Sequence, residues 1–530
     1  MQDLSETLHS GSTPGKRLTV YFFSGLFLFF GVALIAWLAA SILLDPSVRL
    51  GLDEVAPANT EGPSFIMAFL LEIGIVLPIL VFGLAALLIR LGLRLRKGDL
   101  NAARWAQVAL TWMVAGAGVI LVVNVFRLFS GYLFPNPMQP ASLDRGRIGP
   151  IFVLLGMFVF LAGCLAWLIR NMDQVFHGKE RLSAREVRFA WNLLIPTLAV
   201  FILVAARPLE QTFIRSLTDK RFAAQEIPNF VGLDNYRQML GIRLDTVGCR
   251  PGKDGETCAL NPNGSIQWQT IDREVLKEGY RTAWTIRLPF SDPPAALMVS
   301  GLDKDFLRAI GTTLLFAIIS VSLELIAAMY MALVVNSNFF GRGFMRAVML
   351  IPWAIPTVIS ARLWELMLKD TSAGIINRIL MDLRVIAAPV AWLSVAALQM
   401  PSAILVDVWK TSAFMALLLL AGLQTIPADL YEAAAVDGAN RVQQFFSITL
   451  PLMRPTIAVA LVFRTLDALR VFDLFNVLFG RQQLSMATYN YELLVNSQKD
   501  GYASAVSIII FLMISVFAVI YVRMLNVETE

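Results

Sequence analysis

Charged residues are scarce in this chain. Asp, Glu, Lys and Arg make up 16% of the 530 residues, whereas 57% are hydrophobic. Soluble globular domains carry roughly 25% charged residues, so the composition excludes that class. The formal net charge of +5 requires no nucleic-acid partner, because most basic residues lie in short loops beside apolar runs, as the positive-inside rule expects.

Histidine and cysteine are also rare, at two and three residues. His9 and His177 lie outside the apolar runs, so we expect no histidine-based metal site or proton relay. No metal-ligating, nucleophilic or acid–base constellation stands out, and we therefore expect no catalytic residue and no metal in this chain.

A phosphate-binding loop is missing as well. The nearest match is GSTPGKR at 11–17, where three residues instead of four separate the two glycines and Arg17 replaces Ser or Thr. It also lies in a polar tail with no strand before it, which the motif requires. We interpret it as a basic flank of the first apolar run, and this chain is not expected to bind ATP itself.

Long apolar runs, in contrast, recur along the whole chain. Each is long enough to cross roughly 30 Å of hydrocarbon as a helix. The sequence therefore predicts an all-α polytopic membrane protein of about ten spans, at roughly 18–44, 64–89, 106–126, 149–169, 189–206, 306–335, 346–368, 400–424, 453–478 and 502–524. The first run is too long for the core of a signal peptide, so we expect it to be retained.

Charge in the loops predicts the orientation. The loop at 90–104 and the linker at 170–188 are rich in Arg and Lys, and the loop at 45–61 is acidic. The basic loops are expected in the cytoplasm, which puts both termini inside. Segment 426–451 then also lies inside, and segment 207–305 outside.

The basic linker after the fourth span indicates a boundary between two parts of the chain. We divide the chain into an N-terminal extension with four spans at 1–188 and a core with six spans at 189–530. The core contains a turn-rich external insert at 207–305. Cys249 and Cys258 enclose eight residues of that insert, so a disulfide is compatible with the predicted compartment, as are two free thiols.

The stretch YEAAAVDGANRVQQFFSITLP at 431–451 is too polar to lie in lipid. It predicts a short helix, a turn at Asp437-Gly438 where glycine takes positive φ, and a second helix that Asn440 caps. An ordinary helical loop and a docking element both fit this pattern.

The same stretch resembles the EAA loop of ATP-binding-cassette importer permeases. That loop has Glu-Ala-Ala, three residues, Gly, nine residues, Ile, one residue and Leu-Pro, and all of these spacings occur here. In the family this loop is the coupling helix, which docks in a cleft of a separate ATPase subunit that holds ATP and Mg²⁺. The resemblance assigns this role to Glu432, Ala433, Ala434, Asp437, Gly438, Ile448, Leu450 and Pro451.

The resemblance covers about 189–530 and is closest to the maltose, trehalose and α-glucoside branch. FVGLDNY at 230–236, PWAIP at 352–356, GIIN at 374–377 and DVWKT at 407–411 carry it. It implies a type I importer core like the larger permease subunit, in a bacterial cytoplasmic membrane. The implied partners are a second permease subunit, an ATPase dimer, and a periplasmic or lipid-anchored protein that delivers a di- or oligosaccharide. The four spans in 1–188 depart from the family, whose larger subunit has two extra spans.

Two spans carry polar side chains at helical spacing, and such residues usually face a bundle interior or an aqueous path. They are Asp407, Lys410, Thr411 and Phe414 in the eighth span, and Arg464, Asp467, Arg470 and Asp473 in the ninth. Alternatively, Asp407 with Lys410 and Arg464 with Asp467 form neutralising pairs within each helix, or these residues only lock spans together. The resemblance places sugar-contacting positions at Asp407, Lys410, Thr411 and Phe414, and near Arg464, Asp467, Ala468 and Val471.

Other intramembrane features admit a structural interpretation. We expect Glu72 and Glu324 to be packed, hydrogen-bonded residues between helices, and Pro352 with Pro356 to kink the seventh span. Two alternatives to the importer stay open, namely an ion-coupled secondary transporter and a membrane scaffold that transports nothing.

Overall fold

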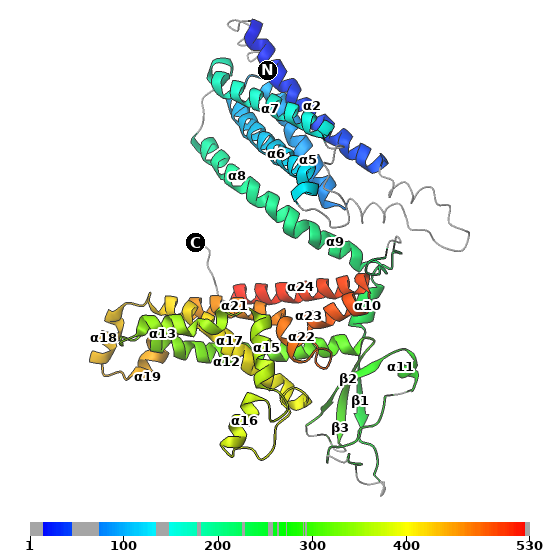
Figure 1. Cartoon of the computed structure of the whole chain (residues 1–530), viewed down its shortest axis with the longest axis vertical. Helices are drawn as coiled ribbons and strands as arrows, with labels where there is room; N and C mark the ends of the chain where they lie inside the picture. The colour runs from blue at the N-terminus through cyan, green and yellow to red at the C-terminus, as the bar shows by residue number, and fades with distance from the viewer. Residues whose placement is uncertain are drawn as a thin grey trace. The chain divides into compact units, whose positions relative to one another are not determined.

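The computed structural model describes residues 14–44, 74–133, 148–176, 182–224, 228–252, 258–261, 264–271, 273–289, 291 and 294–524. The chain divides into two compact units, Met1–Gln211 and Thr212–Glu530, labelled by element in Figure 1. The boundary expected at 188/189 precedes this division. The helix that follows it is grouped with the first unit, in which Trp112 Nε1 donates a hydrogen bond to Asn192 Oδ1 at 3.1 Å.

Long helices build the first unit. They are α2 (Pro14–Leu44), α5 (Val76–Leu95), α6 (Leu100–Leu133), α7 (Ile148–Val175) and α8 (Leu182–Phe201). Helix α8 continues through the π-helical η2 (Ile202–Ala206) into α9 (Arg207–Ser216). Helix α2 packs on α5 and α6 on α7, around a core that includes Phe27, Leu110 and Leu168. The second expected span, 64–89, corresponds to α5, which begins later. Glu72 lies outside the described residues.

The second unit is built around α12 (Lys304–Asn336), α17 (Ala396–Leu423), α21 (Arg454–Leu469) and α24 (Asp500–Met524). Asp303 caps α12, since its carboxylate accepts a hydrogen bond from Phe306 N at 2.9 Å. Small buried residues such as Ala328 on α12 and Ala416 on α17 let helix backbones approach closely, as is typical of membrane bundles. This tight packing positions the polar side chains of the candidate site.

One expected span, at 346–368, is broken at a bend, and the ninth joins the preceding segment 441–452 at a second bend. Among the described residues, eight helices are long and apolar enough to cross a membrane, and two bent pairs raise the count to ten. One pair, Arg342–Ala354 with Thr357–Met367, bends by 89° and comprises α13 (Arg342–Met349), α14 (Ile351–Ala354) and α15 (Thr357–Met367). The other, Arg441–Leu452 with Arg454–Leu469, bends by 68°. The prediction of about ten spans and a kink at Pro352 and Pro356 is confirmed.

The ninth expected span, 453–478, is wrong at its C-terminal end. Helix α21 ends at Leu469, and a separate short helix α22 (Asp473–Leu478) follows. The carbonyl of Val471 accepts a hydrogen bond from Ser485 Oγ at 2.6 Å, which takes an acceptor that a continuous helix would use. After α22 the chain forms α23 (Met486–Tyr491) and the π-helical η4 (Glu492–Asn496) before α24.

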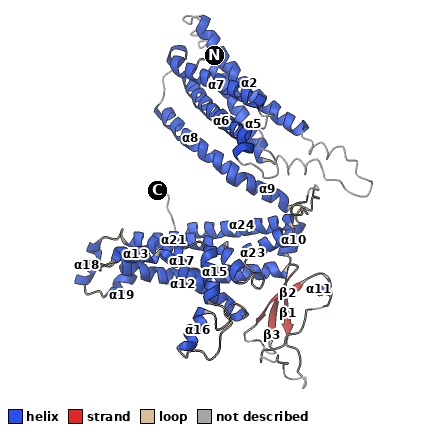
Figure 2. Ribbon diagram, in the orientation of Figure 1, coloured by secondary structure: helices blue, strands red, loops and turns tan. Residues whose placement is uncertain are grey.

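The insert between α9 and α12 holds a small antiparallel sheet. It contains α10 (Asp234–Leu240), β1 (Ile242–Gly248), α11 (Arg273–Lys277), β2 (Arg281–Arg287) and β3 (Ala295–Gly301), with strand order β1-β3-β2. Strands appear only here among the named elements of the described chain (Figure 2). The sequence predicted a small external domain at 207–305, but the β-structure within it was not foreseen.

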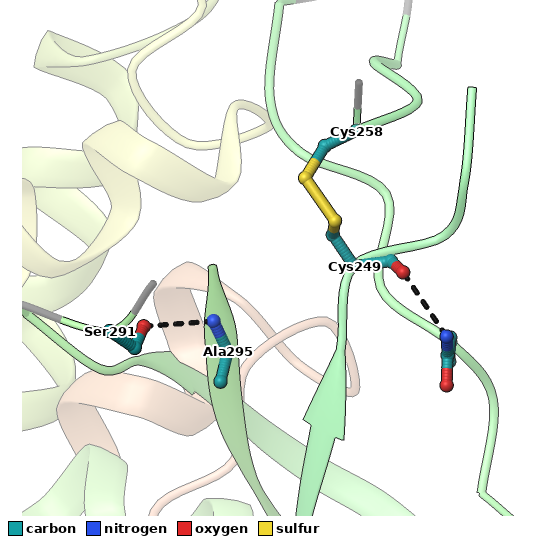
Figure 3. The surroundings of a disulfide bond; sticks show 5 residues. Cys249, Cys258, Ser291 and Ala295 are labelled. Carbon is teal, nitrogen blue, oxygen red and sulfur yellow. Dashed lines mark hydrogen bonds between the residues drawn. A yellow bond between two sulfur atoms is a disulfide. The ribbon is translucent and has the colours of Figure 1, made fainter. Parts of the chain in front are cut away.

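Cys249 and Cys258 form a disulfide in this insert, with their Cα atoms 5.6 Å apart. Figure 3 shows the bond directly after β1, where Gln269 Nε2 donates to Cys249 O at 3.2 Å. Near β3, Ala295 N donates to Ser291 Oγ at 2.9 Å. The structure thus decides between the disulfide and the two free thiols that the sequence left open. The third cysteine, Cys164, is free and buried in α7.

Candidate functional site

A buried arginine connects three helices of the second unit. Arg464 on α21 donates from Nε to Glu324 Oε2 at 2.5 Å and from Nη2 to Glu324 Oε1 at 2.8 Å. The Glu324 side chain on α12 is 0% exposed and that of Arg464 is 4% exposed. The planar guanidinium matches a carboxylate in this paired geometry. The prediction that Glu324 is a hydrogen-bonded residue between helices is confirmed.

The same guanidinium serves two further carboxylates. Arg464 Nη2 donates to Asp407 Oδ2 on α17 at 3.0 Å, and Nη1 donates to Asp467 Oδ2 on its own helix at 2.6 Å. Thr411 Oγ1 adds a hydrogen bond to Glu324 Oε1 at 2.8 Å. The intrahelical pair of Arg464 with Asp467 was one of the two readings that the sequence allowed, whereas Asp407 pairs across helices.

Lys410 takes a different role from the expected pair with Asp407. Its Nζ donates to the backbone carbonyls of Trp353 at 3.3 Å and Ile355 at 2.9 Å. These carbonyls lie at the 89° bend, where Ile355 has extended backbone angles and Pro356 has no N–H to donate. Since backbone groups inside a membrane need internal partners, Lys410 stabilises the broken helix.

A cavity of about 220 Å³ opens beside this network. The rings of Trp353 and Phe414 stack next to it, with centroids 5.0 Å apart and planes inclined by 10°. The outer members of the network are more open, since the side chains of Asp467 and Arg470 are 58% and 68% exposed. The cavity is lined by Trp353, Thr411, Phe414, Phe463, Arg464, Asp467 and Arg470. It thus combines aromatic surface with charged hydrogen-bonding groups.

The sequence-predicted path residues divide into three groups. Thr411, Phe414, Arg464 and Asp467 line the cavity, and Asp407 and Lys410 lie in the network behind it. Ala468 belongs to the buried core and Val471 packs against it. Arg470, directly after the end of α21, also lines the cavity, next to the position that sequence matching placed at Val471.

Two lining residues, Phe463 and Trp353, were missed as path residues. Phe463 precedes Arg464 directly, whereas Arg470 belongs to the polar face that the sequence showed but not to the sugar-contacting positions that the resemblance implied. Trp353 comes from a distant segment, and only its PWAIP context hinted at an irregular backbone.

The segment at 426–451 forms a helical hairpin. It comprises α18 (Ala428–Val436), α19 (Arg441–Gln444), the π-helical η3 (Phe445–Thr449) and α20 (Leu450–Leu452). Gly438 has φ +81°, and Asn440 caps α19 in a reciprocal capping box with Gln443. The predicted turn and cap are both confirmed. Tyr431 OH and Thr449 Oγ1, 2.9 Å apart, tie the two arms together.

The hairpin exposes apolar side chains on a polar loop. Val436 is 87% exposed, Val442 65% and Phe446 62%. Glu432, Ala433 and Asp437 are exposed, whereas Ala434, Ile448, Leu450 and Pro451 are half-buried. Exposed apolar groups on a polar rim are typical of a protein-binding surface. In Figure 1, α18 and α19 lie at the end of the core opposite the β-strands.

Comparison with known proteins identifies the class. Residues 324–527 match the family described as "Binding-protein-dependent transport system inner membrane component". The chain is 46% identical over 226 residues to the "Trehalose/maltose transport system permease protein MalF" of Thermococcus litoralis, covering 42% of this chain and 75% of that protein. It is 35% identical over 228 residues to the "Trehalose transport system permease protein SugA" of Mycobacterium tuberculosis, covering 42% and 71%.

Two further similarities were found. The chain is 35% identical over 230 residues to the "Sulfoquinovosyl glycerol transport system permease protein SmoG" of Agrobacterium fabrum, covering 43% of this chain and 74% of that protein. A bacterial ABC transporter involved in alginate import has a TM-score of 0.46 at 22% identity, covering 66% of this chain and 98% of that one. This chain belongs to the family of binding-protein-dependent transport system inner membrane components, which are ABC transporter permeases. It is a multi-pass component of the inner membrane.

Proposed function

We propose that this chain is the membrane-spanning subunit of an ATP-driven importer for a di- or oligosaccharide. The observation that carries the proposal is the 46% identity to a protein named for trehalose and maltose transport. Sugar recognition needs hydrogen-bonding groups together with flat apolar surface, and the cavity beside Trp353, Phe414 and Asp467 offers both. The substrate path runs along α17 and α21 past this cavity.

The volume of the cavity limits what it holds in this conformation. About 220 Å³ is smaller than the roughly 300–1,000 Å³ of typical ligand pockets. One sugar ring fits this space better than two. A disaccharide then needs either a wider conformation of the bundle or space that a second permease subunit provides.

The charge balance of the cavity favours a neutral sugar. Glu324, Asp407 and Asp467 face Arg464 and Arg470 in the ion-pair network, and Lys410 is held by two carbonyls. Three acids and three bases leave no net charge. Asp467 and Arg470, with side chains 58% and 68% exposed, are the members of this network that hydroxyl groups reach most readily.

The hairpin α18–α20 supplies the coupling to ATP. Glu432, the exposed Ala433 with the half-buried Ala434, and the bend at Gly438 dock in a partner ATPase dimer, which binds ATP and Mg²⁺. The exposed Val436, Val442 and Phe446 support a protein contact at this place. A binding protein delivers the sugar at the opposite end, near the insert at 207–305, and both termini lie in the cytoplasm.

Uptake by the reconstituted assembly tests this proposal. The complex is placed in proteoliposomes with its binding protein, and labelled trehalose and maltose are supplied. Trp353→Ala removes the aromatic surface of the cavity, so uptake should fall by on the order of tenfold while the assembly forms normally. Trp191→Ala is the matched control, because both tryptophans are 45% exposed. Normal uptake by Trp353→Ala contradicts the assigned path.

A further inference from the structure

A second polar cavity, of about 300 Å³, lies at the end of the core where α12 and α24 begin. The segment after α9 and the loop before α24 form its walls, and the start of α12 lies at its base. Its lining includes three cations, Lys220, Arg221 and Lys499, together with Asp303 and two tyrosines. The sugar path described above does not use any of these residues.

The acidic groups of this cavity are already satisfied. Asp303 Oδ1 accepts from Phe306 N, and Oδ2 accepts from Tyr489 OH at 2.5 Å and Tyr502 OH at 2.6 Å. Burial and the hydrogen bond to Asp303 raise the pKa of the Tyr489 hydroxyl above its ordinary value, so it stays a neutral donor. Asp219 accepts from Asn229 N at 2.7 Å and from Asn229 Nδ2 at 3.1 Å.

The three cations of this cavity differ from its acids in their contacts. Within the part of the chain that the structure describes, Lys220, Arg221 and Lys499 have no ion-pair partner. Their neighbour Arg215 differs, since it lies 3.8 Å from Asp500. The cavity therefore carries three cations against the two carboxylates of Asp219 and Asp303, whose oxygens accept hydrogen bonds from neutral donors. Its net charge is positive, and cations held outside ion pairs are the groups that bind an anion.

The two cation-bearing loops are locked together. Phe222 N donates to Gln498 O and Gly501 N donates to Lys220 O, both at 2.9 Å. A Cβ atom at Gly501 would lie 2.0 Å from Thr218 O, so only glycine permits this close approach. Lys220 and Lys499 are thus held on one backbone frame before any ligand arrives.

The position of the cavity favours a lipid over other sources of an anion. It lies at the ends of two membrane-spanning helices, and Phe222 and Phe230 beside it are 48% and 60% exposed. Basic residues beside exposed aromatic and aliphatic groups are typical of contact with the headgroup region of a bilayer. We propose that this cavity binds the headgroup phosphate of an anionic phospholipid, with Lys220, Arg221 and Lys499 as its cationic ligands.

Lipid retention by the purified, assembled transporter tests the proposal. The complex is exchanged into micelles that contain phosphatidylglycerol or phosphatidylcholine, and bound lipid is measured by native mass spectrometry. The triple variant Lys220→Gln, Arg221→Gln, Lys499→Gln is compared with Arg273→Gln, Lys277→Gln, Arg287→Gln, which removes equal charge from exposed sites of the insert. Inorganic phosphate is added in a parallel arm to separate a lipid headgroup from a free anion.

Each cation near an anionic surface contributes a factor of roughly five in binding, so the triple variant should bind phosphatidylglycerol on the order of 100-fold more weakly. The control variant should match the native complex, and inorganic phosphate alone should not displace the lipid. If the triple variant does not assemble, Lys499→Gln alone should show a loss of roughly fivefold. Undiminished phosphatidylglycerol binding by the triple variant or by Lys499→Gln overturns the proposal. Displacement of the lipid by inorganic phosphate also overturns it. The sugar specificity does not enter this test.

Discussion

Arg464 on α21 and Glu324 on α12 are 140 positions apart in the chain, yet their side chains form two hydrogen bonds, at 2.5 and 2.8 Å. This pair connects the site to the bundle. Asp407 and Thr411 on α17 are both held by this pair, Asp407 through Arg464 and Thr411 through Glu324. The pair therefore couples the shape of the candidate sugar path to the packing of three helices.

Removing one member of this pair should be more damaging than removing both. Arg464→Met leaves the buried carboxylates of Glu324 and Asp407 without their cationic partner, which should destabilise the protein by about 3–5 kcal/mol. The double variant Glu324→Gln, Arg464→Met should recover part of that loss. Thermal unfolding of the detergent-purified complex measures both. Arg470→Met is the control, because its exposed pair with Asp467 should contribute at most ~1 kcal/mol.

Lys410 should prove to be a positioning residue for Trp353. Lys410→Met leaves the carbonyls of Trp353 and Ile355 without their donor, so the bend should shift and uptake should fall on the order of tenfold. Lys410→Arg keeps a donor and should retain much of the activity. Cysteine substituted at 353 in a cysteine-free background reports the shift through its labelling rate. Lys369→Met, at an exposed lysine, should change neither readout. A labelling rate that Lys410→Met leaves unchanged would rule out this role.

At Gly438 the backbone angle, not space, limits substitution. A Cβ there would meet nothing within 4 Å, but φ is +81°. Gly438→Ala should cost roughly 1–2 kcal/mol in the hairpin and weaken the stimulation of ATP hydrolysis by sugar-loaded binding protein. Gly438→Asn, which tolerates this conformation, should retain most of it. Gly343→Ala is a control in a helix with free space. Equal stimulation by the alanine and asparagine variants would show that the bend does not matter.

The disulfide predicts a simple labelling pattern. Under denaturing, non-reducing conditions only Cys164 should react with an alkylating reagent, whereas all three cysteines should react after reduction. Mass spectrometry of the intact chain distinguishes these results. Replacing Cys249 and Cys258 by serine should destabilise the insert by roughly 2–4 kcal/mol, seen as faster proteolysis within 249–258. Three labels before reduction would contradict the bridge.

Local patterns predicted much of this structure. The length of each apolar run predicts the spans, because in lipid a helix pairs its backbone N–H and C=O groups within one segment. Asn440 and Gly438 act within a few residues of their own position, so their cap and turn could be read from the sequence.

Tertiary contacts explain what the sequence could not predict. The spacing of Asp407 and Lys410 suggested a pair, but Lys410 reaches across helices to the carbonyls of Trp353 and Ile355 at the bend. Asp407 instead accepts a hydrogen bond from Arg464. The cavity with Lys220 and Lys499 also could not be predicted from the sequence. The two lysines come together only when two distant loops exchange backbone hydrogen bonds.

ATP-dependent uptake tests the central claim most directly. The assembled transporter and its binding protein are placed in proteoliposomes, with ATP inside or absent, and with the proton gradient present or collapsed. We predict that uptake of labelled trehalose or maltose requires ATP and continues unchanged when the gradient is collapsed. Uptake that persists without ATP and stops with the gradient would contradict the account and favour an ion-coupled transporter.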